Sequence, residues 1–136
     1  PRHRLHLTLL FLGACGPRRL QRAGDVGRES VRQVPAAPVS ISGAGTFGSV
    51  LWLGVNAPWL LTLHAELRDR LGLLAERRGF RAHLTVARSR GEGVAAAALP
   101  ALELVTTRSW VPDALTLVAA TSAPQPTYEI LDRFEW

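Results

Sequence analysis

The chain has 136 residues and a mass of 14.8 kDa, the size of a single domain, over residues 1–136, that can bury a core of its own. Hydrophobic residues make up 47% of the chain and charged residues 20%, values that exclude a disordered protein. The formal net charge is +5 and all 16 basic residues are arginine, which favours phosphate-bearing partners, although codon bias and solubility explain the charge equally well.

In chain order, the hydrophobic pattern predicts a mixture of strands and helices. Residues 4–13 form an apolar strand, and residues 18–34 form a helix that two glycines weaken. A short alternating strand at residues 39–42 runs into a turn at residues 43–45. A buried strand follows at residues 49–55.

The clearest element is a helix that begins after Asn56, its expected N-cap, with Pro58 in the first turn. Its apolar stripe consists of leucines at helical spacing, namely Leu60, Leu63, Leu67, Leu71 and Leu74. Residues 80–87 form the next strand, and residues 91–100 form a connector of small residues. The remaining strands are predicted at residues 102–107, 114–119 and 127–136. This succession indicates an α/β or α+β domain.

Cys15 is the only cysteine, so neither an internal disulfide nor a cysteine-based zinc site is available. A reducing, cytoplasmic compartment is therefore the default. No apolar run reaches the roughly 18 residues needed to span a bilayer. Residues 1–15 imitate a bacterial lipoprotein signal, but His6 and Thr8 interrupt the apolar stretch, and a strand is the preferred interpretation.

The most informative feature is an internal repeat. Residues 6–8 and 83–85 both read His-Leu-Thr, 77 residues apart, each on a predicted strand. Because a strand alternates its faces, the histidine and threonine of each motif project to one side, and Leu7 and Leu84 project into a core. A lone triplet of this kind is usually structural, but two among four histidines arise by chance on the order of once in a thousand cases.

Three interpretations of the repeat compete. The first is a duplicated strand whose histidines make structural hydrogen bonds. The second is a metal site, which lacks a carboxylate or a third histidine at matching spacing. The third is an acid–base pair with two hydroxyl groups beside it, and it fits best. Opening a cyclic phosphate with water needs one base and one acid, which histidine can supply at neutral pH, while threonine hydroxyls donate to the phosphate oxygens.

Residues 6–13, His-Leu-Thr-Leu-Leu-Phe-Leu-Gly, and residues 80–88, Phe-Arg-Ala-His-Leu-Thr-Val-Ala-Arg, resemble the paired motifs of the 2H phosphoesterase superfamily. Within it, the chain is most similar to bacterial and archaeal RNA 2′,3′-cyclic phosphodiesterases, also called 2′-5′ RNA ligases. The resemblance implies a bilobed α+β fold, in which two antiparallel sheets line a central cleft with helices outside. It also implies hydrolysis of RNA 2′,3′-cyclic phosphate ends to 2′-phosphates, with reversible 2′-5′ ligation.

Carried over by position, the resemblance makes His6 and His83 catalytic and Thr8 and Thr85 phosphate-binding, with no metal and no cofactor. By analogy, His6 protonates the departing 3′ oxygen and His83 activates water, although the residues themselves leave this order open. The expected partners are RNA or nucleotide 2′,3′-cyclic phosphate ends, tRNA fragments among them, and the expected state is a monomer.

Arg88 is a further phosphate-binding candidate, because the matching arginine contacts phosphate in relatives. Strict alternation places it on the strand face opposite His83, so it reaches the site only if the strand ends or bulges. Relatives also carry more residues before the first motif, so the resemblance implies that the N-terminal strand and helix of the first lobe are missing.

Two other functions remain open. The same site can act on another cyclic phosphate or on a 2′-5′ linkage, or the chain can be a non-catalytic nucleotide- or RNA-binding module, because substrate choice lies outside the two motifs. His64, on the leucine-striped helix, is assigned a structural role. The tryptophans are assigned to the core, namely Trp52, Trp59, Trp110 and Trp136.

Overall fold

The computed structural model describes residues 5–74, 79–90, 92–121 and 127–136. These residues form three helices and five strands. In chain order they are α1 (Pro17–Gln33), β1 (Ser40–Phe47), β2 (Val50–Asn56), α2 (Trp59–Arg70), β3 (His83–Arg88), α3 (Glu92–Glu103), β4 (Ala114–Ala120) and β5 (Tyr128–Glu135). Among the described helices, none is long and apolar enough to cross a membrane.

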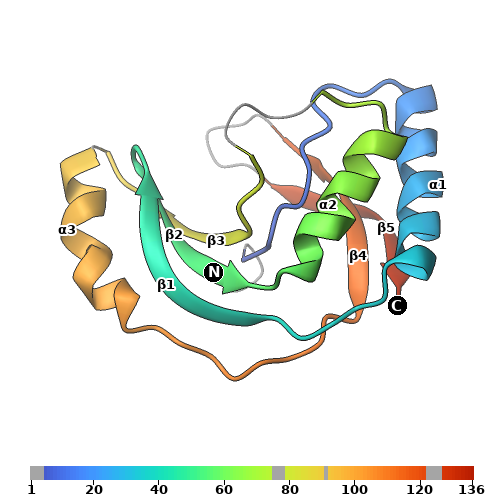
Figure 1. Cartoon of the computed structure of the whole chain (residues 1–136). Coiled ribbons are helices and arrows are strands. Elements are labelled where there is room, and N and C mark those ends of the chain that lie inside the picture. Colours follow the sequence, from blue (N-terminus) through green and yellow to red (C-terminus); the bar gives the residue numbers. More distant parts are fainter. Residues whose placement is uncertain (1–4, 75–78, 91, 122–126) are drawn as a thin grey trace.

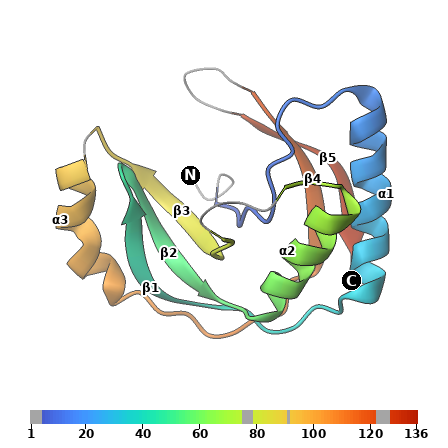
Figure 2. The ribbon, with the colours of Figure 1, turned by 45° about the horizontal axis from the view of Figure 1, so that its top comes forward.

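The strands form two separate antiparallel sheets. The first has the order β1-β2-β3, and the second consists of β4 and β5. The two sheets occupy opposite halves of the molecule, with α3 beside the first and α1 beside the second (Figures 1 and 2). Contacts agree, since α3 packs on β1 and β2 and α1 packs on β4, β5 and α2. The predicted α+β fold with two antiparallel sheets is confirmed.

The predicted helix at residues 18–34 is confirmed as α1, and its glycines have a packing role. A Cβ atom added to Gly27 would lie 2.4 Å from the ring of Phe134 on β5. Gly24 and Gly27 are both buried on the face that meets the second sheet. Glycine lowers helix propensity, but here it lets the helix backbone approach the sheet closely.

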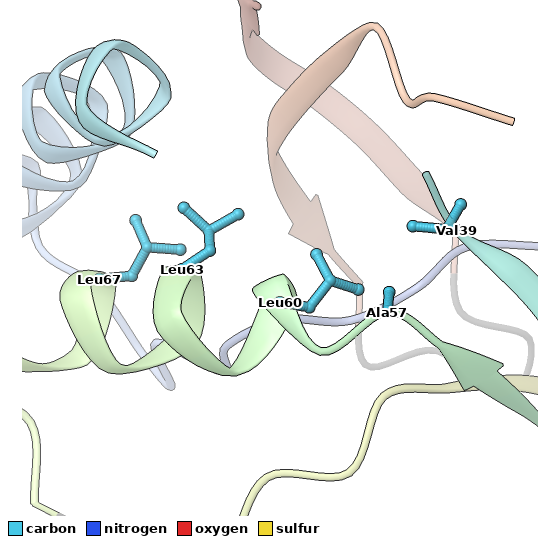
Figure 3. Packing of buried hydrophobic residues seen from close by; sticks show 5 residues of the cluster. All are labelled: Val39, Ala57, Leu60, Leu63 and Leu67. Carbon is cyan, nitrogen blue, oxygen red and sulfur yellow. The ribbon is translucent and has the colours of Figure 1, made fainter. Parts of the chain in front are cut away.

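The main core lies under α2 (Figure 3). Leu60, Leu63 and Leu67 are buried at helical spacing, and Leu63 has no exposed surface. They pack with Val39 and Ala57. The leucine stripe therefore predicted the buried face of this helix correctly from Leu60 to Leu67, about two of its turns.

The ends of α2 differ from the prediction. Asn56 is not its N-cap, because Asn56 pairs with Ser40 in the first sheet and the helix is capped by Pro58 without a side-chain hydrogen bond. The helix ends at Arg70, and Gly72 follows with a φ of 65°. Leu74 lies beyond the helix and is 93% exposed, so the stripe continues in the sequence after the helix has ended.

Two predictions between the sheets are wrong. Within the connector predicted for residues 91–100, whose first residue lies outside the described residues, α3 begins at Glu92 and runs to Glu103. Alanine has the highest helix propensity, and Ala95 is 1% exposed, but Gly93 and Pro100 obscured the helix. The strand predicted at residues 102–107 is replaced by the end of α3 and an irregular segment.

The turn predicted at residues 43–45 is also wrong. β1 continues through these residues to Phe47, and the chain turns at Gly48, which has a φ of 57°. The register of β1 against β2 shifts between Ile41 and Ala44, and Gly43 within that shift has a φ of 73°. The glycines thus mark a β-bulge inside a strand, which is another structure that favours them.

The strand predicted at residues 4–13 is shorter than expected, and residue 4 lies outside the described residues. Over residues 5–13 the structure has one isolated antiparallel bridge, from Leu7 to Leu84 on β3. Leu7, Leu9 and Leu10 pack against the core under α2. The segment is therefore held mainly by apolar packing, with a single backbone pairing to the first sheet.

Candidate functional site

The bridge between Leu7 and Leu84 brings the two His-Leu-Thr motifs side by side. Paired residues on neighbouring strands project to the same side, and their neighbours along each strand project to the other side. The two histidines and two threonines of residues 6–8 and 83–85 therefore share one side, opposite to that of Leu7 and Leu84. Because the pairing is antiparallel, it sets each histidine opposite the threonine of the other motif.

β2 borders the site on the other side of β3. Gly54 pairs with His83, and Trp52 pairs with Thr85, so both lie on the side of the sheet that carries the second motif. A Cβ atom at Gly54 would lie 2.5 Å from the carbonyl oxygen of Ser42. Only glycine fits at this position, because the bulged backbone of β1 comes too close for a side chain.

A register shift in β3 decides where Arg88 points. Thr85 pairs with Trp52, but Ala87 pairs with Leu51 and Arg88 with Val50. One extra residue of β3, Val86, therefore stands between two consecutive pairs, which is a β-bulge.

The bulge reverses the alternation for the residues that follow it. Arg88 is opposite Val50, and Val50 is two residues from Trp52 on β2, so Arg88 shares the side of His83 and Thr85. Arg88 is an exposed residue. The placement of Arg88 expected from strict alternation is wrong, and the bulge that the sequence interpretation required is present.

The backbone before β3 orients His83. Its Nδ1 atom lies 2.7 Å from the carbonyl oxygen of Arg81. A carbonyl oxygen can only accept, so Nδ1 carries the proton in this hydrogen bond. In the neutral imidazole, Nε2 is then the unprotonated nitrogen that can accept a proton. The same hydrogen bond persists when the ring is protonated, because both nitrogens then donate.

Aromatic rings flank both histidines. The ring of Phe47 lies 5.2 Å from that of His83 in an edge-on arrangement, and Trp52 lies 6.3 Å from it. At the first motif, the ring of Tyr128 lies 4.6 Å from that of His6. Tyr128 comes from β5, so the second sheet reaches the motif of residues 6–8.

Tyr128 was missed by the sequence analysis. It is the only tyrosine and the first residue of β5, but no pattern connects the last strand with the first motif. Of the tryptophans, Trp52 is 4% exposed, as expected for the core. Trp110 is 46% exposed, so its assignment to the core is wrong; it forms a backbone bridge with Val39 instead.

His64 supports both motifs from α2. It is 5% exposed, its Nδ1 donates to the carbonyl oxygen of Leu9 over 2.8 Å, and its ring stacks on Phe80 at 4.3 Å. Leu9 follows the first motif directly, and Phe80 precedes the second by three residues. The structural role expected for His64 is confirmed.

Other parts of the described surface offer less chemistry. No three histidine, cysteine or carboxylate side chains come together among the described residues as a metal site would require. Two shallow hollows lie beside α1, and residues from β4 and β5, such as Leu117 and Phe134, line them with those of α1. Neither hollow includes a residue of the two motifs.

Comparison with known proteins decides the family. The sequence profile described as the 2′-5′ RNA ligase superfamily matches residues 1–123. The chain belongs to this superfamily. Two curated relatives are both named RNA 2′,3′-cyclic phosphodiesterase. The protein of Methanothermobacter thermautotrophicus is 36% identical over an alignment of 98 residues, and the match covers 64% of this chain and 52% of the relative. The protein of Archaeoglobus fulgidus is 42% identical over an alignment of 94 residues, and the match covers 62% of this chain and 51% of the relative. The chain thus spans about half the length of these two superfamily members.

Solved structures share the fold. A protein of Thermus thermophilus superposes with a TM-score of 0.77 at 24% identity, over 99% of this chain and 79% of that one. The E. coli protein LigT complexed with 3′-AMP superposes with a TM-score of 0.71 at 27% identity, over 96% of this chain and 74% of LigT. Most of the described chain therefore has the fold of these proteins.

Proposed function

We propose that the chain hydrolyses RNA 2′,3′-cyclic phosphate ends to 2′-phosphates, with His6 and His83 as a metal-independent acid–base pair. Reversible 2′-5′ ligation, in which an RNA 5′ hydroxyl takes the place of water, is a second reaction of the same site. The observation that carries the proposal is the bridge between Leu7 and Leu84, which aligns the two His-Leu-Thr motifs. The names of the two curated relatives support the substrate class. The complex of LigT with 3′-AMP supports a nucleotide as part of the substrate.

In this mechanism His83 is the base. Its Nδ1 proton is held by the carbonyl of Arg81, which leaves Nε2 to take a proton from water. The water oxygen forms a bond to phosphorus as the bond from phosphorus to the 3′ oxygen breaks. His6 donates a proton to the departing 3′ oxygen, so the product carries a 2′-phosphate and a 3′-hydroxyl. Each histidine finishes in the protonation state in which the other began.

The remaining groups of the site bind the phosphate. Thr8 and Thr85 donate hydrogen bonds to the non-bridging oxygens, where negative charge grows in the transition state. Arg88, brought to the same side by the bulge in β3, supplies a guanidinium that matches two phosphate oxygens at once. These groups stabilise charge without a metal ion.

The wider setting is part of the same proposal. A monomer is sufficient, because both motifs come from one chain. RNA ends of the required kind, tRNA fragments among them, are the proposed partners. The cytoplasm is the proposed compartment, because a chain with a single cysteine has no internal disulfide for an oxidising environment to maintain.

The proposed function is tested by assaying a panel of substrates in the presence of EDTA. We expect hydrolysis of 2′,3′-cyclic nucleotides and of RNA with a 2′,3′-cyclic phosphate end, with 2′-phosphate products and the same rate with and without the chelator. The panel includes ADP-ribose 1″,2″-cyclic phosphate and a 2′-5′ oligoadenylate. If only one of these two compounds is hydrolysed, that compound replaces the RNA end as the proposed substrate. Binding without any turnover would indicate a binding module. Activity that is lost in EDTA and restored only by added zinc or magnesium would contradict the two-histidine mechanism.

Replacing Thr85 by valine tests the phosphate-binding role of the hydroxyl. We expect kcat/KM to fall by a factor that corresponds to about 1–3 kcal/mol, the usual cost of one lost hydrogen bond to a buried or charged partner. Thr8→Val should have an effect of the same size. Thr116→Val is the matched control, because Thr116 is an exposed residue of β4; an equal loss of activity in this variant would show that the change acts through stability.

A further inference from the structure

Arg81 lies at the edge of the site. The proposed acid–base mechanism uses its backbone carbonyl but gives its side chain no role. It is exposed and precedes His83 by two residues. Its guanidinium carbon lies 4.5 Å from the centre of the Trp52 ring. Since Trp52 pairs with Thr85 and its ring is 6.3 Å from that of His83, the guanidinium lies on an indole that neighbours the second motif.

The indole under Arg81 is held in place. Trp52 is 4% exposed, and a Cβ atom at Gly45 would lie 2.1 Å from its ring, so the glycine leaves the space that the indole fills. The ring of Phe47 contacts it at 5.1 Å. Tryptophan is the most favourable aromatic partner for a cation. The stacking therefore fixes the position of a positive charge on a rigid surface.

The hydrogen-bonding groups of Arg81 remain available. Among the described residues, no hydrogen bond or ion pair engages its guanidinium, whereas Arg28, Arg70 and Arg133 each bind carboxylates. A guanidinium has five N–H donors and no acceptor. One of its faces lies on the indole, so the groups it presents are the N–H donors at its edges, which match an anion with paired oxygens.

We propose that Arg81 binds the phosphodiester on the 5′ side of the terminal nucleotide, and that the site therefore prefers RNA ends to cyclic mononucleotides. This inference rests on the proposed function, which places the cyclic phosphate between the two histidines. The next phosphate along an RNA strand is then the nearest further anion of the substrate. A cyclic mononucleotide has no phosphate at this position, so the contact with Arg81 is made only by an oligonucleotide.

The test compares three substrates that end in a 2′,3′-cyclic phosphate. The first is a mononucleotide, the second a dinucleotide, and the third the same dinucleotide with a neutral methylphosphonate linkage. The proteins are the parent, Arg81→Gln, Arg88→Gln and Arg19→Gln. Arg19 is an exposed residue of α1 and serves as the control for the loss of one positive charge.

In the parent, we expect kcat/KM for the charged dinucleotide to exceed that for the neutral one by about 10- to 100-fold, the range of a charge-assisted hydrogen bond. Arg81→Gln should bring this ratio close to one. It should also reduce the slope of log(kcat/KM) against log salt by about 0.7 for the charged dinucleotide. Arg88→Gln should lower kcat/KM for all three substrates and keep the ratio, and Arg19→Gln should change neither.

Because the ratio is taken within each variant, any effect of the substitution on the orientation of His83 cancels. A ratio unchanged in Arg81→Gln would overturn the inference and leave the proposed function intact, as would a parent ratio near one. A loss that is equal for both dinucleotides would assign Arg81 to the second base instead of the phosphate, and would overturn it too. A parent that hydrolyses none of the three substrates would overturn the proposed function itself.

Discussion

Replacing His83 by alanine is expected to lower the turnover of a 2′,3′-cyclic mononucleotide by at least about 10²-fold, the usual contribution of one acid–base group. His6→Ala should cost a similar factor. The parent should show a bell-shaped dependence of kcat/KM on pH, because one imidazole must be neutral and the other protonated. Each single variant should lose the limb of the profile that its histidine supplies. Rates across pH for the parent and both variants provide the measurement.

The double variant separates a catalytic unit from two independent effects. Groups that act together in one proton relay give strongly non-additive losses, so His6→Ala/His83→Ala should be little slower than the more damaged single variant. Thermal unfolding of all four proteins is the control for folding. Near-parental turnover in His83→Ala, with the fold intact, would remove the two-histidine mechanism.

Replacing Leu63 by alanine is expected to reduce the free energy of unfolding by about 2–5 kcal/mol. Leu63 has no exposed surface and lies at the centre of the core under α2, so the lost side chain leaves a cavity that its neighbours cannot fill completely. Urea denaturation of the parent and the variant measures the difference.

Leu61→Ala is the matched control, because Leu61 belongs to the same helix and is 55% exposed. The same chemical change there should alter the free energy of unfolding by no more than about 0.5 kcal/mol. Equal losses at the two positions would mean that helix propensity, and not burial, dominates the effect, which would contradict the core described for α2.

The sequence predicted features that depend on a local repeat of two or 3.6 residues. The leucine stripe identified the buried face of α2, and the alternation in the second motif set His83 and Thr85 on one side of β3. The pattern of apolar residues also predicted the ends of β2, β4 and β5 to within one or two residues. In each of these cases the burial of a face determines the conformation, and the pattern of apolar residues records that burial.

Features that depend on the partner strand could not be read in the same way. The side on which Arg88 lies is decided by one extra residue, Val86, and that residue is extra only with respect to β2. Tyr128 approaches His6 from the second sheet, a contact between the two ends of the chain. The alanine-rich helix α3 was missed for a different reason, since a run of small residues has no apolar stripe to recognise.

The pairing of Leu7 with Leu84 also determines when the proposed acid–base pair can form. It joins segments 77 residues apart, and the entropy cost of closing a loop increases with its length. The β1–β2 and β4–β5 hairpins are local and can form without it, whereas contacts between distant segments form slowly. During synthesis, the first motif therefore emerges long before its partner and has no catalytic function until β3 is made. In the finished protein, we expect release of this one segment from β3 to separate the two proposed catalytic histidines and to stop the proposed reaction while both sheets stay folded.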